Sequence, residues 1–172
     1  AGRVGVTGIP MRGPDPSSAV DFGAVRTEFE LVEDYPADVL AEARASADRF
    51  AEGREDRRDI EFVTIDPPGA KDLDQAVHIA AEGDGYLVRY AIADVGALVA
   101  PGGALEAETR RRGQTMYLPD GSVPLHPRPL SEGAGSLLPE QDRAAALWEI
   151  HLDAAGEVTS ATVRRAVPSL ST

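Results

Sequence analysis

Apolar residues in the first third of the chain recur at the spacing of helices. Phenylalanine and valine follow each other at intervals of three and four residues between Phe22 and Val32, which predicts a short helix from Ser17. A longer helix is predicted over residues 36–53, because it would begin at a proline and gather its apolar side chains on one face. Those side chains are Val39, Leu40, Ala43, Ala47 and Phe50.

Charged residues crowd positions 52–59 and end this helical pattern. Such a segment is typical of a linker, so we expect a division into two units. The first unit, residues 1–58, would hold an N-terminal arm and the helical module. The second unit would cover residues 59–172.

The second unit shows the two-residue period of strands. Strands are predicted at residues 60–65, 76–80, 86–93, 146–152 and 158–163, with tight turns at 82–85 and 153–156. Between the two resulting hairpins we expect a short helical turn at 94–99, a helix over 104–112 closed by Gly113, and a long ordered loop over the proline-rich residues 118–139. The pattern predicts an α+β fold, with an N-terminal helical pair followed by a mostly antiparallel sheet and a helix packed against it.

Composition limits the classes of function. A net charge of −12 argues against a uniformly positive surface that wraps nucleic acid, so any RNA contact must be local. The chain has no cysteine, which excludes disulfides and cysteine-ligated zinc. Its apolar runs are far shorter than the roughly 20 residues that span a bilayer, so we expect a cytoplasmic protein without membrane contact.

Three aspartates, Asp66, Asp72 and Asp74, lie within nine residues between two predicted strands. Carboxylates held close together repel one another, and a divalent cation relieves that repulsion. Magnesium suits such hard oxygen ligands, especially beside a phosphate. The simpler alternative is that the aspartates only solvate a turn, as short acidic motifs commonly do.

Four segments together resemble a known family. They are T-I-D-P-P-G-A-K-D-L-D-Q-A, Y-A-I-A-D-V, Y-L-P-D-G-S-V-P-L-H-P and S-L-L-P-E-Q-D-R. Their order and spacing are similar to the catalytic domain of RNB-type (ribonuclease II-like) exoribonucleases, over about residues 59–167. The resemblance implies 3′-to-5′ hydrolysis of single-stranded RNA to nucleoside 5′-monophosphates, dependent on Mg²⁺ or alternatively Mn²⁺.

The resemblance also implies roles for individual residues. Asp66, Asp72 and Asp74 match acidic positions that bind magnesium, and Asp72 and Asp74 are the candidate catalytic residues. Gln75 stands where many members carry a fourth aspartate, so it offers the metal a neutral carbonyl oxygen. Tyr117 matches a tyrosine that lies against the RNA near its 3′ end, where stacking tolerates any base; packing at a strand end is the alternative.

Two arginines complete the candidate RNA contacts. Arg110 lies in a run of three arginines in the last turn of the predicted helix, where complementing the helix dipole is the favoured role and gripping phosphate is the alternative. Arg128 lies near His126 in the proline-rich loop, where an ordinary exposed-loop role is favoured for both.

An RNB domain is longer than this chain, so we expect an incomplete catalytic region that is weakly active or inactive in isolation. The alternative function is an inactive RNB-like module that binds RNA or a protein partner.

Overall fold

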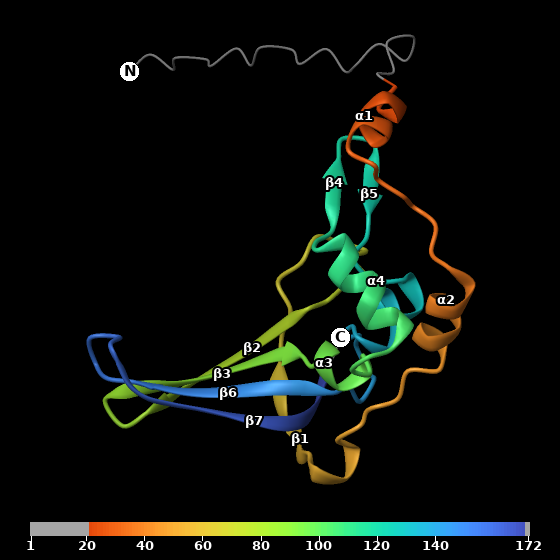
Figure 1. Ribbon diagram of the computed structural model, residues 1–172. Coiled ribbons are helices and arrows are strands. Elements are labelled where there is room, and N and C mark those ends of the chain that lie inside the picture. Colours follow the sequence, from red (N-terminus) through yellow and green to blue (C-terminus); the bar gives the residue numbers. More distant parts are fainter. Residues whose placement is uncertain (1–20, 171–172) are drawn as a thin grey trace, which may run out of the picture.

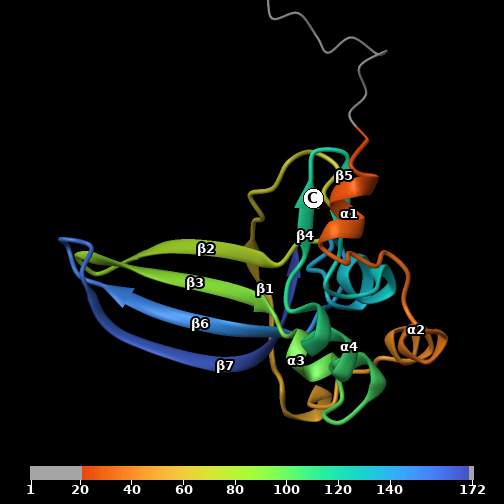
Figure 2. The ribbon, with the colours of Figure 1, turned by 45° about the horizontal axis from the view of Figure 1, so that its top comes forward.

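The computed structural model describes residues 21–170 (Figure 1). A five-stranded sheet forms a long curved arm, and helices gather at one end of it (Figure 2). The elements are α1 (Gly23–Glu28), α2 (Ala37–Arg44), β1 (Glu55–Phe62), β2 (Gln75–Glu82), β3 (Gly85–Ala93), α3 (Val95–Leu98), α4 (Ala104–Arg112), β4 (Met116–Leu118), β5 (Gly121–Val123), β6 (Ala145–Leu152) and β7 (Val158–Leu170), with a 3₁₀ turn at Ala51–Gly53 and a π-helical turn at Leu130–Ala134.

The large sheet has the order β1-β7-β6-β3-β2, in which only the β1–β7 pair is parallel. The two predicted hairpins, β2–β3 and β6–β7, are confirmed. The first turns tightly at Gly83, whose φ of +59° lies in the region that glycine adopts without strain. The α+β fold is therefore confirmed, with a mostly antiparallel sheet and α4 at its end.

One face of the sheet forms the main core. Ala76, Ala91 and Leu147 lie opposite one another on neighbouring strands and are at most 2% exposed. Phe62 of β1 is fully buried in the same cluster. A second apolar cluster joins α2 to α3, α4 and the π-helical turn, through Val39, Ala43, Leu98, Leu105 and Leu130. This packing holds the helices and the π-helical turn together at one end of the molecule.

Several predicted boundaries are wrong. The helix expected over 36–53 ends at Arg44, because Asp48 turns its carboxylate to the backbone N–H of Phe50 and to Arg54. The first helix begins at Gly23, and its predicted start at Ser17 lies outside the described residues. The loop expected over 118–139 contains the β5 strand and the π-helical turn.

Strand β1 begins at Glu55, five residues before the strand expected at 60–65. The division expected between residues 58 and 59 thus falls inside β1, and a two-domain organisation stays a prediction. Within residues 21–170, no helix is both long and apolar enough to cross a membrane.

Candidate active site

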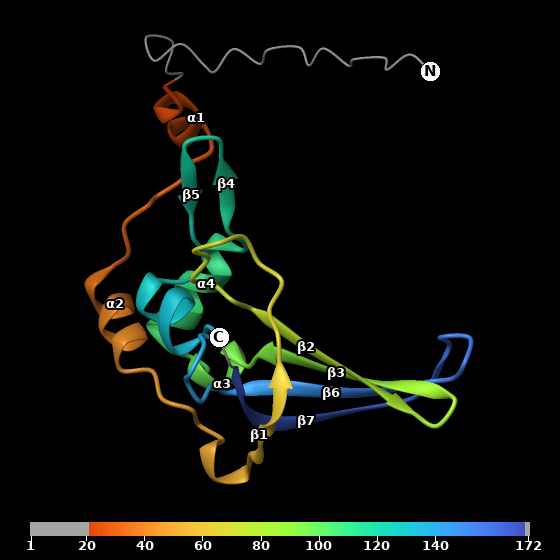
Figure 3. The same ribbon diagram turned by 180° about the vertical axis from the view of Figure 1, so that it is seen from behind.

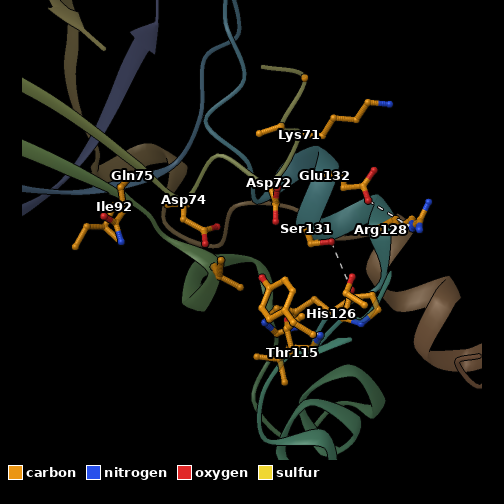
Figure 4. Close-up of a pocket in the computed structure, with 18 residues that line it drawn as sticks. Lys71, Asp72, Asp74, Gln75, Ile92, Thr115, His126, Arg128, Ser131 and Glu132 are labelled. Carbon is orange, nitrogen blue, oxygen red and sulfur yellow. Dashed lines mark hydrogen bonds and ion pairs between the residues drawn. The ribbon is translucent and has the colours of Figure 1, made fainter. Parts of the chain in front are cut away.

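A cavity of about 650 Å³ lies at the helical end of the sheet (Figure 4). Its wall comes from the acidic segment, the end of β3, the β4–β5 hairpin and the chain that leads into the π-helical turn. Figure 3 shows why these segments meet: the chain between β1 and β2 rises toward the β4–β5 hairpin before it returns into β2. The polar wall residues are Lys71, Asp72, Asp74, Gln75, Thr115, Tyr117, Ser122, His126, Arg128, Ser131 and Glu132.

The acidic segment is held by its apolar middle residue. Leu73 is buried, its N–H donates to Ser136 Oγ at 2.9 Å, and its carbonyl accepts from the N–H of Leu137 at 2.8 Å. Ser136 itself is fully buried. Because Leu73 is anchored, the flanking Asp72 and Asp74 keep a fixed position on the cavity wall.

The three aspartates share a surface. Asp66, Asp72 and Asp74 line a second hollow next to the main cavity, and Asp72 and Asp74 line both. Burial raises the pKa of the Asp74 carboxyl, and the negative charges of Asp72 and Asp66 raise it further. The cluster therefore has negative charge that the surrounding protein leaves uncompensated.

These residues suit a magnesium ion that is bound only partly by protein. In residues 21–170, no three histidine, aspartate or glutamate side chains close into a metal-binding group. Magnesium commonly takes one or two carboxylates and completes its shell with waters and substrate phosphates. Asp72 and Asp74 fit that description, and direct ligation by Asp66 stays a prediction.

The exposed side chain of Gln75 is hydrogen-bonded to the neighbouring strand. The hydroxyl of Tyr90 donates a hydrogen bond to Gln75 Oε1 across the β2–β3 pair. A carbonyl oxygen has a second lone pair, so this bond leaves one acceptor position. The predicted role of Gln75 as a metal ligand is untested.

Of the three predicted RNA-contacting residues, two line the cavity and one does not. Tyr117, on β4, lines the cavity and its side chain is 78% exposed, so packing at a strand end is excluded. Arg128 lines the same cavity and lies 3.4 Å from Glu132. Arg110 pairs with Glu106 at 2.8 Å and is not part of the cavity wall, so the structure does not bring it to this site.

The other two arginines of that run have structural partners. Arg111 and Arg112 both bind Glu108, and the guanidinium of Arg112 lies 3.7 Å from the ring centre of Tyr35. Arg112 also donates to the backbone oxygen of Asp34 at 2.7 Å. This arginine therefore ties the segment before α2 to α4, beyond any effect on the helix dipole.

His126 was assigned an exposed-loop role from the sequence, and this is wrong. The side chain is half-buried and its Nδ1 lies 3.1 Å from Thr109 Oγ1 on α4. It lines the cavity together with Asp72 and Asp74. A single histidine in a proline-rich loop has no periodic pattern, and the family resemblance of the segment around it assigned His126 no role.

Comparison with known proteins identifies similar chains. Residues 54–169 match the family described as RNB domain. Ribonuclease R of Acidithiobacillus ferrooxidans is 40% identical over 140 residues, which are 79% of this chain and 32% of that protein. Ribonuclease R of Escherichia coli (strain K12) is 39% identical over 118 residues, which are 68% of this chain and 14% of that protein.

A solved structure has the same fold. Mycoplasma genitalium RNase R in complex with ribose methylated single-stranded RNA superposes with a TM-score of 0.80 at 29% identity, over 86% of this chain and 24% of that one. The chain thus spans about a third or less of the length of these relatives.

Proposed function

Because the chain belongs to the RNB domain family, we propose that the protein containing it degrades single-stranded RNA from the 3′ end, releasing nucleoside 5′-monophosphates in a Mg²⁺-dependent reaction. Mn²⁺ is the alternative ion. The family name and the RNA-bound relative support the class of substrate. The ion is inferred from the acidic cluster and from the family resemblance of the sequence.

One observation supports this proposal most strongly. Asp66, Asp72 and Asp74 lie around one hollow, and Asp72 and Asp74 also face the main cavity. The raised pKa of Asp74 means that burial and the neighbouring carboxylates disfavour its ionised form, which a positive charge nearby would stabilise. A bound divalent ion would supply that charge, polarise the scissile phosphate and lower the pKa of the attacking water.

The residues of this chain have separate tasks in the proposed reaction. Asp72 and Asp74 would hold the ion, which would help to orient water toward the last phosphodiester. Lys71 and Arg128, the two cationic residues on the cavity wall, attract the RNA phosphates locally, although the whole chain carries a net charge of −12. Tyr117 offers its exposed ring to a base of the substrate.

The ring of Tyr117 provides a testable contact. Replacing Tyr117 with alanine is expected to weaken RNA binding by about 1–3 kcal/mol, since one stacking surface is lost. Fluorescence anisotropy of a labelled oligoadenylate in EDTA would measure this change without cleavage. Tyr117→Phe keeps the ring and should bind like the wild type; equal weakening by both variants would show that stacking is not the contact.

The proposed activity is tested directly on the protein as its gene encodes it. Labelled single-stranded RNA is incubated with Mg²⁺, with Mn²⁺ and with EDTA, and the products are separated by length. We expect mononucleotides that accumulate only with a metal ion. RNA that binds but stays intact under all three conditions would instead support a non-catalytic RNB-like module.

A further inference from the structure

The hydrogen bonds around His126 define which of its ring nitrogens has the proton. Thr109 Oγ1 donates its only hydrogen to the backbone oxygen of Leu105 at 2.7 Å. The contact of 3.1 Å between Thr109 Oγ1 and His126 Nδ1 therefore needs the hydrogen on the nitrogen, so Nδ1–H donates to Oγ1. In a neutral imidazole this leaves Nε2 as a bare acceptor.

The neutral form is the relevant one at neutral pH. Burial lowers the pKa of the His126 imidazole below its ordinary value. The ring is therefore uncharged at neutral pH, and Nε2 keeps its lone pair.

The positions of Thr109 and His126 indicate which edge of the ring the cavity contacts. Thr109 lies on α4 and is not part of the cavity wall, whereas His126 is. Because the Nδ1 edge is directed at Thr109, the opposite edge with Nε2 is the one available to the cavity. Figure 4 shows His126 on the side of the cavity away from Asp74.

A half-buried neutral acceptor needs a donor from the ligand. RNA phosphates offer only acceptors, and base amino groups differ from one base to the next. The ribose 2′-hydroxyl is a donor that every ribonucleotide has and that DNA lacks. Its hydrogen bond would be independent of the base sequence.

We propose that His126 is a specificity-determining residue, whose Nε2 accepts a hydrogen bond from a ribose 2′-hydroxyl in the cavity and so favours RNA over DNA. This role rests on the proposed function, because it places RNA in the cavity beside Asp72 and Asp74. Thr109 is then a positioning residue, since it fixes the tautomer of His126.

The test combines a change in the protein with a change in the substrate. His126→Leu removes the acceptor, whereas His126→Gln keeps an acceptor oxygen near the position of Nε2. Each protein is given an all-ribose oligoadenylate and the same oligomer with 2′-deoxyadenosine at its last three positions. We expect His126→Leu to lower kcat/KM about tenfold on the ribose substrate, as for one lost hydrogen bond, and to change the deoxy substrate little.

Controls separate this role from a structural one. His126→Gln should recover most of the ribose preference, and Thr109→Val, which releases the tautomer, should reduce it without removing the imidazole. An equal loss on both substrates would overturn the proposal. The same pair of oligomers ending in uridine should give the same loss; a loss that differs between adenosine and uridine ends would also overturn the proposal, because it would indicate recognition of the base.

Binding distinguishes failure of this inference from failure of the proposed function. Anisotropy in EDTA compares the affinities for the two oligomers without cleavage. If the wild type cuts no RNA, the proposed function is wrong, yet a ribose preference that disappears in His126→Leu would still support the role of His126. A wild type that binds both oligomers equally would overturn it.

Discussion

Replacing Asp74 with asparagine is expected to lower RNA degradation at least about 100-fold, because the proposed ion would lose one of its charged ligands. The same change should make the metal-free protein more stable. Both effects arise from one property of the site, the uncompensated charge around Asp74.

The direction of the stability change follows from the pKa. Burial, with Asp72 and Asp66, holds the pKa of Asp74 above its ordinary value in the folded protein. The folded state therefore binds this proton more tightly than the unfolded chain does, and that contribution to stability is lost as the pH rises through the raised pKa. At neutral pH the ionised carboxylate opposes folding, and asparagine removes it.

Urea unfolding at pH 7 in EDTA, together with the RNA digestion assay, measures both effects. Asp84→Asn, in the exposed turn between β2 and β3, is the matched control and should change neither quantity. If Asp74→Asn kept full activity, or destabilised the metal-free protein, the charge cluster would not have the role described.

Replacing Arg54 with methionine is expected to lower the free energy of unfolding by about 3–5 kcal/mol, as for breaking a buried ion pair. The Arg54 side chain is 1% exposed and donates to Asp48, to Asp94 at 2.8 Å and to the backbone oxygen of Ala145 at 3.0 Å. Methionine keeps much of the volume but removes the cation that pairs with Asp48, and Asp94 then has only the Arg165 guanidinium, at 3.3 Å.

The Arg54→Met change should also disturb the candidate active site. Asp94 lies between Ala93 and Val95, which both line the main cavity. The control is Arg58→Met, whose side chain is 51% exposed and pairs with Asp56 and Asp142 on the surface. We expect the control to change unfolding little, because exposed ion pairs are screened by water. Equal unfolding midpoints in urea for the two variants would contradict a structural role for Arg54.

Local sequence patterns predicted the sheet well. The alternation of apolar and polar residues, with glycine at the turns, placed both hairpins, since a strand shows a different chemistry on each face. The helix expected over residues 36–53 was too long because Ala47 and Phe50 continue its period by chance. In the structure the ring of Phe50 lies instead beneath the guanidinium of Arg165, at 3.9 Å.

Contacts between residues far apart in the chain could not be predicted from the sequence. The acidic residues were evident as a cluster in the sequence, but the anchor that holds them joins Leu73 to Ser136, 63 residues away. His126 likewise reaches the site through packing against α4, which its own neighbours in the sequence do not indicate. The family resemblance assigns a role to Tyr117, whereas His126 lies in the same matching segment and was assigned no role there.

Calorimetric titration of the protein with Mn²⁺ tests the central claim most directly, because it needs neither RNA nor turnover. The account predicts saturable binding to the wild type that is weakened in Asp72→Asn and in Asp74→Asn but unchanged in Asp84→Asn. Binding that is equal in all four proteins, or heat that never saturates in the wild type, would contradict a divalent-ion site at the acidic cluster.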